Sequence, residues 1–180
     1  MTESKLLRRF RPNGRNLAGL FAGYYVAELL GALTDENDPH PELFDLADVT
    51  LAALAEGGAT HRWLARFELG ALRLLGHMPL LDRCAECGAA VELVERMAFG
   101  AMHGGVLCKA CRPGKSDVAS VTAGMLKTMK VLADPHGQAW KRIEIDLRMW
   151  SEMRSVLNHY FVNLLGREPR MYRYLHEFWK

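Results

Sequence analysis

The sequence predicts a mainly α-helical protein: a helical bundle domain interrupted by an inserted segment that contains short β-strands. Two observations support this fold class. Apolar residues recur at helical spacing on both sides of the insertion, and the inserted segment holds all four cysteines of the chain. The cysteines form two matched pairs separated by twenty residues, Cys84-Ala85-Glu86-Cys87 and Cys108-Lys109-Ala110-Cys111.

The composition agrees with this class. Of the 180 residues, 49% are hydrophobic and 24% are charged, which is ordinary for a globular protein. We expect three parts: a basic N-terminal segment (residues 1–16), a helical domain (residues 17–79 plus 119–180) and the cysteine-containing insertion (residues 80–118).

Three helices are expected before the cysteines. Residues 17–33 are apolar on most faces, which predicts a central helix. The polar stretch 35–40 ends it, and Pro41 is well placed in the first turn of a second helix. Thr60 can cap a third helix, which carries an apolar stripe towards the first cysteine pair.

Further helices are expected after the insertion. Ser120 or Thr122 can cap the first of them, and the turn residues 134–137 follow it. The clearest amphipathic pattern covers residues 149–164. Pro169 then opens a short last helix through Phe178.

The insertion itself has strand character at residues 91–99, followed by a glycine-rich turn at 100–105. About forty residues with so little apolar material cannot pack a core alone. Two C-x2-C turns can supply the four thiolates that a tetrahedral Zn²⁺ prefers. We therefore expect a zinc ribbon with a structural zinc ion, and the alternatives are a redox C-x2-C motif or a pair of disulfides. The expected ligands are Cys84, Cys87, Cys108 and Cys111.

The net charge of +2 conceals basic ends around an acidic middle. From Asn16 to His61 there is no Lys or Arg, while eight acidic residues occur between Glu28 and Glu56. Basic ends of this kind favour contact with phosphates, because released counterions drive such binding. The alternative is a solvated surface that contacts nothing.

No catalytic motif is found. The sequence lacks the H-E-x-x-H, G-x-x-x-x-G-K-[ST], G-x-G-x-x-G and G-x-S-x-G patterns, so we expect a protein that is not an enzyme. The longest uncharged apolar run, Leu17 to Ala27, is too short to span a bilayer. Thiolate ligands suit a reducing compartment, which predicts a cytoplasmic location.

The order of these features resembles the helical, zinc-containing region of the bacterial recombination mediator family RecO. The likeness covers nearly the whole chain, and the order and spacing of its pieces make it fairly specific. Its pieces are residues 24–30, 41–46, 66–69, 74–84 with the C-x2-C-G that follows, 104–108 and 165–170.

The resemblance implies a non-enzymatic role in DNA repair by homologous recombination, with no membrane and no small-molecule substrate. Such proteins bind DNA, anneal complementary strands and work with RecR. They engage the acidic C-terminal tail of single-stranded DNA-binding protein and help to load RecA, which implies association with the nucleoid. The family begins with an OB barrel, and no strand-rich run precedes Leu17, so we expect that barrel to be absent and DNA affinity to be weakened.

Two basic clusters are candidates for binding phosphate or an acidic peptide. The second is the weaker candidate, and a zinc-stabilised helical scaffold that only assembles with partner chains is the alternative function. The first cluster is Arg8, Arg9, Arg11 and Arg15, and the second is Arg167, Arg170 and Arg173.

Overall fold

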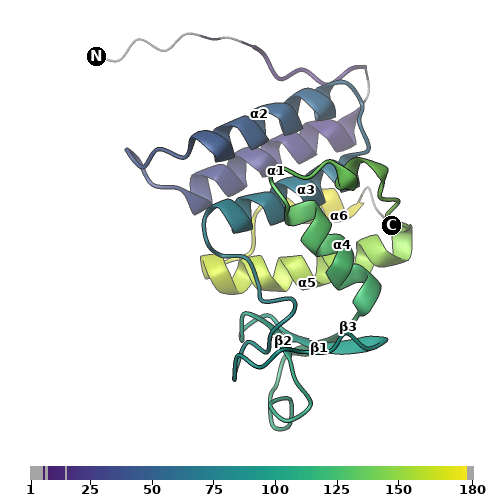
Figure 1. Cartoon of the computed structure of the whole chain (residues 1–180). Helices are drawn as coiled ribbons and strands as arrows, with labels where there is room; N and C mark the ends of the chain where they lie inside the picture. The colour runs from purple at the N-terminus through teal and green to yellow at the C-terminus, as the bar shows by residue number, and fades with distance from the viewer. Residues whose placement is uncertain (1–5, 7, 15, 178–180) are drawn as a thin grey trace. The chain divides into compact units, whose positions relative to one another are not determined.

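The computed structural model describes residues 6, 8–14 and 16–177, in which six α-helices, one 3₁₀ helix and a three-stranded antiparallel sheet are found (Figure 1). The predicted fold class, mainly helical with short strands in the cysteine segment, is confirmed. By its internal contacts the chain forms two compact units, one of residues 1–64 with 170–180 and one of residues 65–169. The three-part division expected from the sequence stays a prediction.

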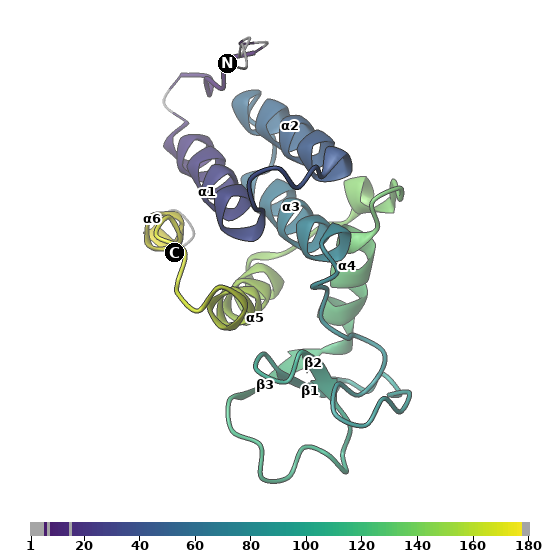
Figure 2. The same ribbon diagram turned by 90° about the vertical axis from the view of Figure 1, so that its left-hand side faces the viewer.

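The first unit contains α1 (Leu17–Leu33), α2 (Pro41–Ala55) and α6 (Tyr172–Glu177), and α1 and α2 lie side by side in both Figure 1 and Figure 2. Asn16 caps α1, because its side-chain oxygen accepts the Gly19 N–H at 2.8 Å. Pro41 begins α2, as the sequence predicts. The α3 helix (Thr60–Leu74) crosses the boundary between the units.

The last helix begins later than the sequence predicts. The backbone N–H groups of Arg170 and Met171 donate to the Glu28 carboxylate, at 2.7 and 2.8 Å. The Glu28 side chain of α1 therefore satisfies these two donors. Both residues precede α6, which starts at Tyr172. The rings of Phe21 and Tyr174 stack with centroids 5.5 Å apart and join the same two helices.

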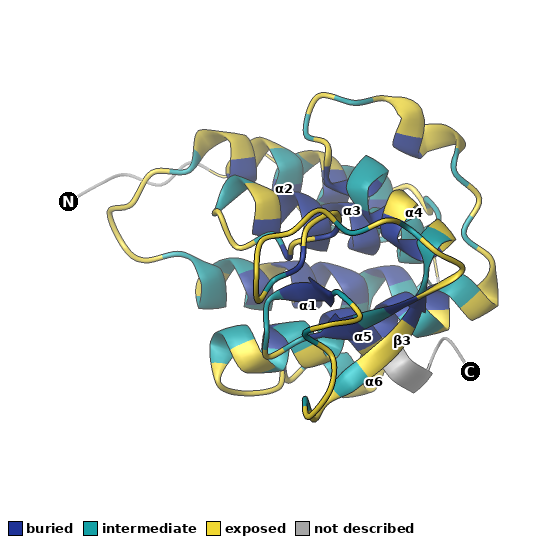
Figure 3. Ribbon diagram, turned by 60° about the horizontal axis from the view of Figure 1, so that its bottom comes forward, coloured by how far each residue is buried: buried dark blue, intermediate teal, exposed yellow. Residues whose placement is uncertain are grey.

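The helix with the longest continuous buried stretch is α3, whereas the sequence favoured the helix at residues 17–33 for the central position. Every residue from Leu64 to Leu72 is buried, and Figure 3 shows this stretch in dark blue. By contrast, α1 exposes Leu17 and Tyr24. The sequence does not predict the burial of α3 because this helix contains Arg66 and Glu68, whose charges are satisfied by partners inside the fold.

The second unit contains the sheet, α4 (Ala123–Ala133), the 3₁₀ helix η1 (Ala139–Arg142) and α5 (Leu147–Leu165). Thr122 caps α4 by accepting the Met125 N–H at 3.1 Å, which selects it over Ser120. Asp146 caps α5 in the same way, and Gly166 ends it with a positive φ of 69°.

The sheet has the strand order β2–β1–β3, formed by β1 (Arg96–Gly100), β2 (Gly105–Leu107) and β3 (Val118–Thr122). Residues 91–95, predicted as strand, lie outside it, because Ala90 bridges to Arg83 and the Val91 N–H donates to the Asp82 carbonyl. Strand β3 was not predicted from the sequence. In the register Phe99 lies opposite Val106 and Ala119.

Candidate metal centre

Each cysteine pair forms a tight turn closed by backbone hydrogen bonds. In the first turn the Gly88 N–H donates to the Cys84 carbonyl at 2.8 Å, and Gly88 has a positive φ of 70°. In the second turn the N–H groups of Cys111 and Arg112 both donate to the Cys108 carbonyl, at 3.2 and 3.1 Å. These turns point both cysteines of a pair in one direction, as a shared metal requires.

Strand β2 brings the two turns together. The Ala85 N–H donates to the Val106 carbonyl at 2.8 Å, and the Cys108 N–H donates to the Cys84 sulfur at 3.4 Å. All four Sγ atoms lie within 4.8 Å of one another, and those of Cys87 and Cys108 are 3.9 Å apart. Zn–S bonds of about 2.3 Å in a tetrahedron place sulfurs ~3.8 Å apart, so the cluster fits a zinc ion.

The ionisation of the thiols also favours a cation. Hydrogen bonding by the Cys108 backbone N–H lowers the pKa of Cys84 to about 6, although burial opposes this. The neighbouring sulfurs, first that of Cys108 and then that of Cys87, raise the pKa of Cys111 to about 12. Cys111 therefore resists ionisation beside the other sulfurs, and a divalent cation would supply the missing positive charge.

An exposed ion pair links the first cysteine turn to the chain after the second. The Glu86 carboxylate lies 2.9 Å from Lys115 Nζ and 3.8 Å from His103 Nδ1. The hydrogen bond from Lys115 lowers the pKa of Glu86. His103 is outside the group of four sulfurs and is oriented by Glu86 instead.

Gly105 lets the Leu80 backbone lie close beside the start of β2, where the two residues form a parallel bridge. The Leu80 N–H donates to the Gly104 carbonyl and the Val106 N–H donates to the Leu80 carbonyl, each at 2.9 Å. A Cβ on Gly105 would overlap the Leu80 carbonyl and lie 2.7 Å from the Leu80 nitrogen. The backbone φ of Gly105 is +149°. The chain entering the first cysteine turn therefore requires glycine here.

We expect Gly105→Ala to lower the free energy of unfolding by about 3 kcal/mol and to weaken zinc retention, because the Leu80 backbone must move. Gly104→Ala is the matched control. Gly104 has a positive φ of 81°, and a Cβ added there would meet no atom within 4 Å, so backbone strain alone should cost about 1 kcal/mol. Thermal unfolding and zinc content measure both, and equal losses would contradict the role of Leu80.

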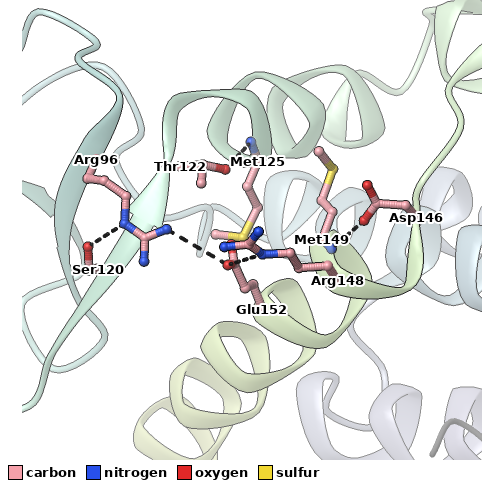
Figure 4. A network of polar contacts seen from close by, with 8 residues as sticks. All are labelled: Arg96, Ser120, Thr122, Met125, Asp146, Arg148, Met149 and Glu152. Carbon is pink, nitrogen blue, oxygen red and sulfur yellow. Dashed lines mark hydrogen bonds and ion pairs between the residues drawn. The ribbon is translucent and has the colours of Figure 1, made fainter.

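A polar network connects the sheet to α5 (Figure 4). Arg96 of β1 donates to the Ser120 hydroxyl of β3 at 3.1 Å, and its guanidinium lies 3.9 Å from the Glu152 carboxylate. Arg148 approaches the same carboxylate at 3.7 Å along α5. Glu152 therefore receives two cations, one from the sheet and one from its own helix.

The structure places the first basic cluster on the first unit. Arg8 forms an ion pair with Asp48 of α2, and the hydrogen bond that the guanidinium donates to the Asp48 carboxylate raises the pKa of Arg8. Arg9 and Arg11 are exposed and form no ion pair within the part of the chain that the structure describes. Arg15 lies outside the described residues.

The second basic cluster is divided between the units. Arg167 belongs to the second unit, whereas Arg170 and Arg173 belong to the first. The Arg173 guanidinium lies 4.8 Å from the centroid of the Tyr174 ring and donates to its hydroxyl at 3.0 Å. Both clusters stay predictions as binding sites.

Glu68 and Arg154 form a buried pair that was not predicted from the sequence. The two side chains are hydrogen-bonded, and their side-chain exposures are 0% and 6%. A glutamate inside the apolar stripe of the third helix is the signal that could have found it, because such a group requires an internal partner.

No helix in the described residues is long and apolar enough to cross a membrane. The fold and the sulfur cluster define a class: a helical protein whose inserted β-segment brings four cysteines within reach of one metal ion. The family model for the Recombination protein O C terminal matches residues 14–173, so the chain belongs to the RecO family. The resemblance seen in the sequence is thereby confirmed.

Three relatives illustrate this membership, each a DNA repair protein RecO. The protein of Rhodopirellula baltica (strain DSM 10527 / NCIMB 13988 / SH1) is 34% identical over 97% of this chain and 73% of its own length. That of Anaeromyxobacter sp. (strain K) is 36% identical over 96% and 67%. That of Roseiflexus sp. (strain RS-1) is 31% identical over 97% and 62%.

Proposed function

We propose that this protein acts in DNA repair by homologous recombination as a mediator that binds and transfers, without catalysing a reaction. The observation that carries the proposal is the family match over residues 14–173. Its partners would be DNA, RecR and the acidic C-terminal tail of single-stranded DNA-binding protein. Through them it would assist strand annealing and RecA loading, at the nucleoid in the cytoplasm.

The metal in this proposal is a structural zinc ion. Four sulfurs fill a tetrahedral shell and leave no position for water or substrate, so the ion would cross-link two turns and supply no chemistry of its own. Support comes from the mutual approach of the four Sγ atoms within 4.8 Å. The ligands would be Cys84, Cys87, Cys108 and Cys111.

The proposal is tested by binding of the zinc-loaded chain to a labelled peptide of aspartates ending in phenylalanine, and to single-stranded DNA. Salt-sensitive binding of both is expected for a mediator. Binding of neither at low salt would contradict it and leave the scaffold function, for which size-exclusion chromatography with candidate partner chains is the measurement.

The exposed basic residues of the N-terminal segment would contact phosphates. We expect Arg9→Ala with Arg11→Ala to reduce the slope of log affinity against log salt for single-stranded DNA by about 1.4, since each phosphate contact contributes about 0.7. Lys127→Ala, which removes one exposed charge of α4, is the control for a general charge effect. An unchanged slope in the double variant would remove these arginines from the interface.

A further inference from the structure

A cavity of about 530 Å³ lies in the second unit, beside the sulfur cluster. Its lining comes from the loop at residues 90–94, from the sheet and from the second cysteine turn. This volume falls within the range of small-ligand and peptide-anchor pockets. The metal centre does not account for it, because Cys108 is the only one of the four cysteines among its described lining residues.

The walls of this cavity are aliphatic. On the sheet, Met97, Ala98, Leu107 and Ala119 line the cavity, whereas the buried side chains of Phe99 and Val121 do not. Val91 and Val94 line it from the loop, and Val94 is 42% exposed. No aromatic side chain occurs among the described lining residues.

Cations predominate at the rim. Lys109 and Arg112 are exposed and form no ion pair within the described chain, whereas nearby Lys115 is paired with Glu86. Glu92 is the one carboxylate among the described lining residues. A third cation, Arg96, is held in the wall by its contacts with β3 and α5.

We propose that this cavity binds an acidic peptide through one aliphatic side chain, with the peptide carboxylates at Lys109 and Arg112. An aliphatic pocket suits an apolar side chain, and unpaired cations at its mouth suit carboxylates. Single-stranded nucleic acid fits less well, because base stacking requires aromatic side chains, which this lining lacks. The inference rests on the proposed function, since it locates a partner-peptide site within it.

The metal centre limits the electrostatic part of this binding. Four thiolates around zinc would carry a net negative charge, and this charge would attract the same two cations, Lys109 and Arg112. The apolar walls should therefore supply most of the affinity, and the carboxylates should set the orientation of the peptide and the salt dependence.

The test is fluorescence anisotropy with the zinc-loaded full chain and three labelled probes. One probe is a peptide with a single leucine among aspartates, the second has serine in place of that leucine, and the third is an oligothymidine. The cavity variants are Val94→Asp and Arg112→Glu. Their controls are Val49→Asp, at a half-exposed valine of α2, and Arg83→Glu, which also adjoins a cysteine but does not line the cavity.

The cavity variants, and separately the serine probe, should each lower affinity roughly tenfold, as expected for loss of one charge-assisted or apolar contact. The controls should change it less than twofold, and zinc content should be unchanged in every variant. If the leucine peptide binds all variants equally, the cavity assignment is wrong while the proposed function stands. If the chain binds oligothymidine but no acidic peptide, the cavity assignment alone is wrong, and if it binds neither, the proposed function is wrong as well. If the cavity variants weaken only oligothymidine binding, the occupant is nucleic acid.

Discussion

Cys84→Ser is expected to abolish stoichiometric zinc binding and to unfold residues 80–118. Cys84 is fully buried, and its sulfur accepts the N–H of Cys108, so its loss removes a ligand and a link between the two turns. Structural zinc in small modules contributes about 10–16 kcal/mol of apparent binding free energy, which is comparable to or above the net stability of a domain. The sheet face that packs inward is too small to replace it, since it consists of Met97, Phe99, Val106 and Val121.

Zinc content by metal analysis and hydrogen exchange by mass spectrometry measure this prediction. Exchange should become fast across residues 80–118, while α1 and α2 of the first unit keep their protection. Ala85→Ser is the matched control, because it places a hydroxyl in the same turn without touching a ligand. A variant, or a metal-free wild type, that stays fully protected in the insertion would contradict a structural metal.

The sequence predicted the parts of this fold that local patterns determine. The cysteine spacing predicted the sulfur cluster because both turns are short and self-contained. Pro41 marked a helix start correctly, and Thr122 is one of the two caps that the sequence offered for α4. Strand β3 was missed because Val118–Thr122 is short and half-exposed, and because its strand structure depends on pairing with β1. Such pairing is a long-range property that no local pattern carries.

The continuous burial of α3 was not predicted, for a related reason. Burial of Leu64–Leu72 depends on internal partners for two charged residues, and those partners lie far along the chain. Arg66 donates to the carbonyl groups of Leu132 and Pro135 at the end of α4, the second of them at 3.0 Å. A charge that a sequence pattern assigns to solvent can therefore belong to the core, and only the fold reveals this.

We expect Glu68→Ala to lower the free energy of unfolding by about 3–5 kcal/mol, because it leaves the Arg154 guanidinium charged and buried. Arg154 is buried, and its guanidinium lies 5.4 Å from the centroid of the Trp150 ring, which cannot replace a carboxylate. Urea denaturation followed by circular dichroism measures the loss. Asp82→Ala is the control: it breaks a surface pair with Lys130, at 3.0 Å, and should cost less than about 1 kcal/mol.

A double-mutant cycle separates the stability that the charge pair contributes from the stability that its side chains contribute by filling space. Glu68→Leu combined with Arg154→Met removes both charges, and the double variant should recover most of the stability that either single change loses.

Glu152, two residues before Arg154 on α5, forms an ion pair with Arg96 of β1, so a displaced α5 would also loosen the sheet (Figure 4). Zinc content should nevertheless stay stoichiometric below the unfolding transition, because residues 80–112 close the sulfur cluster by themselves. Loss of zinc from folded Glu68→Ala would show instead that the helices hold the metal site in place.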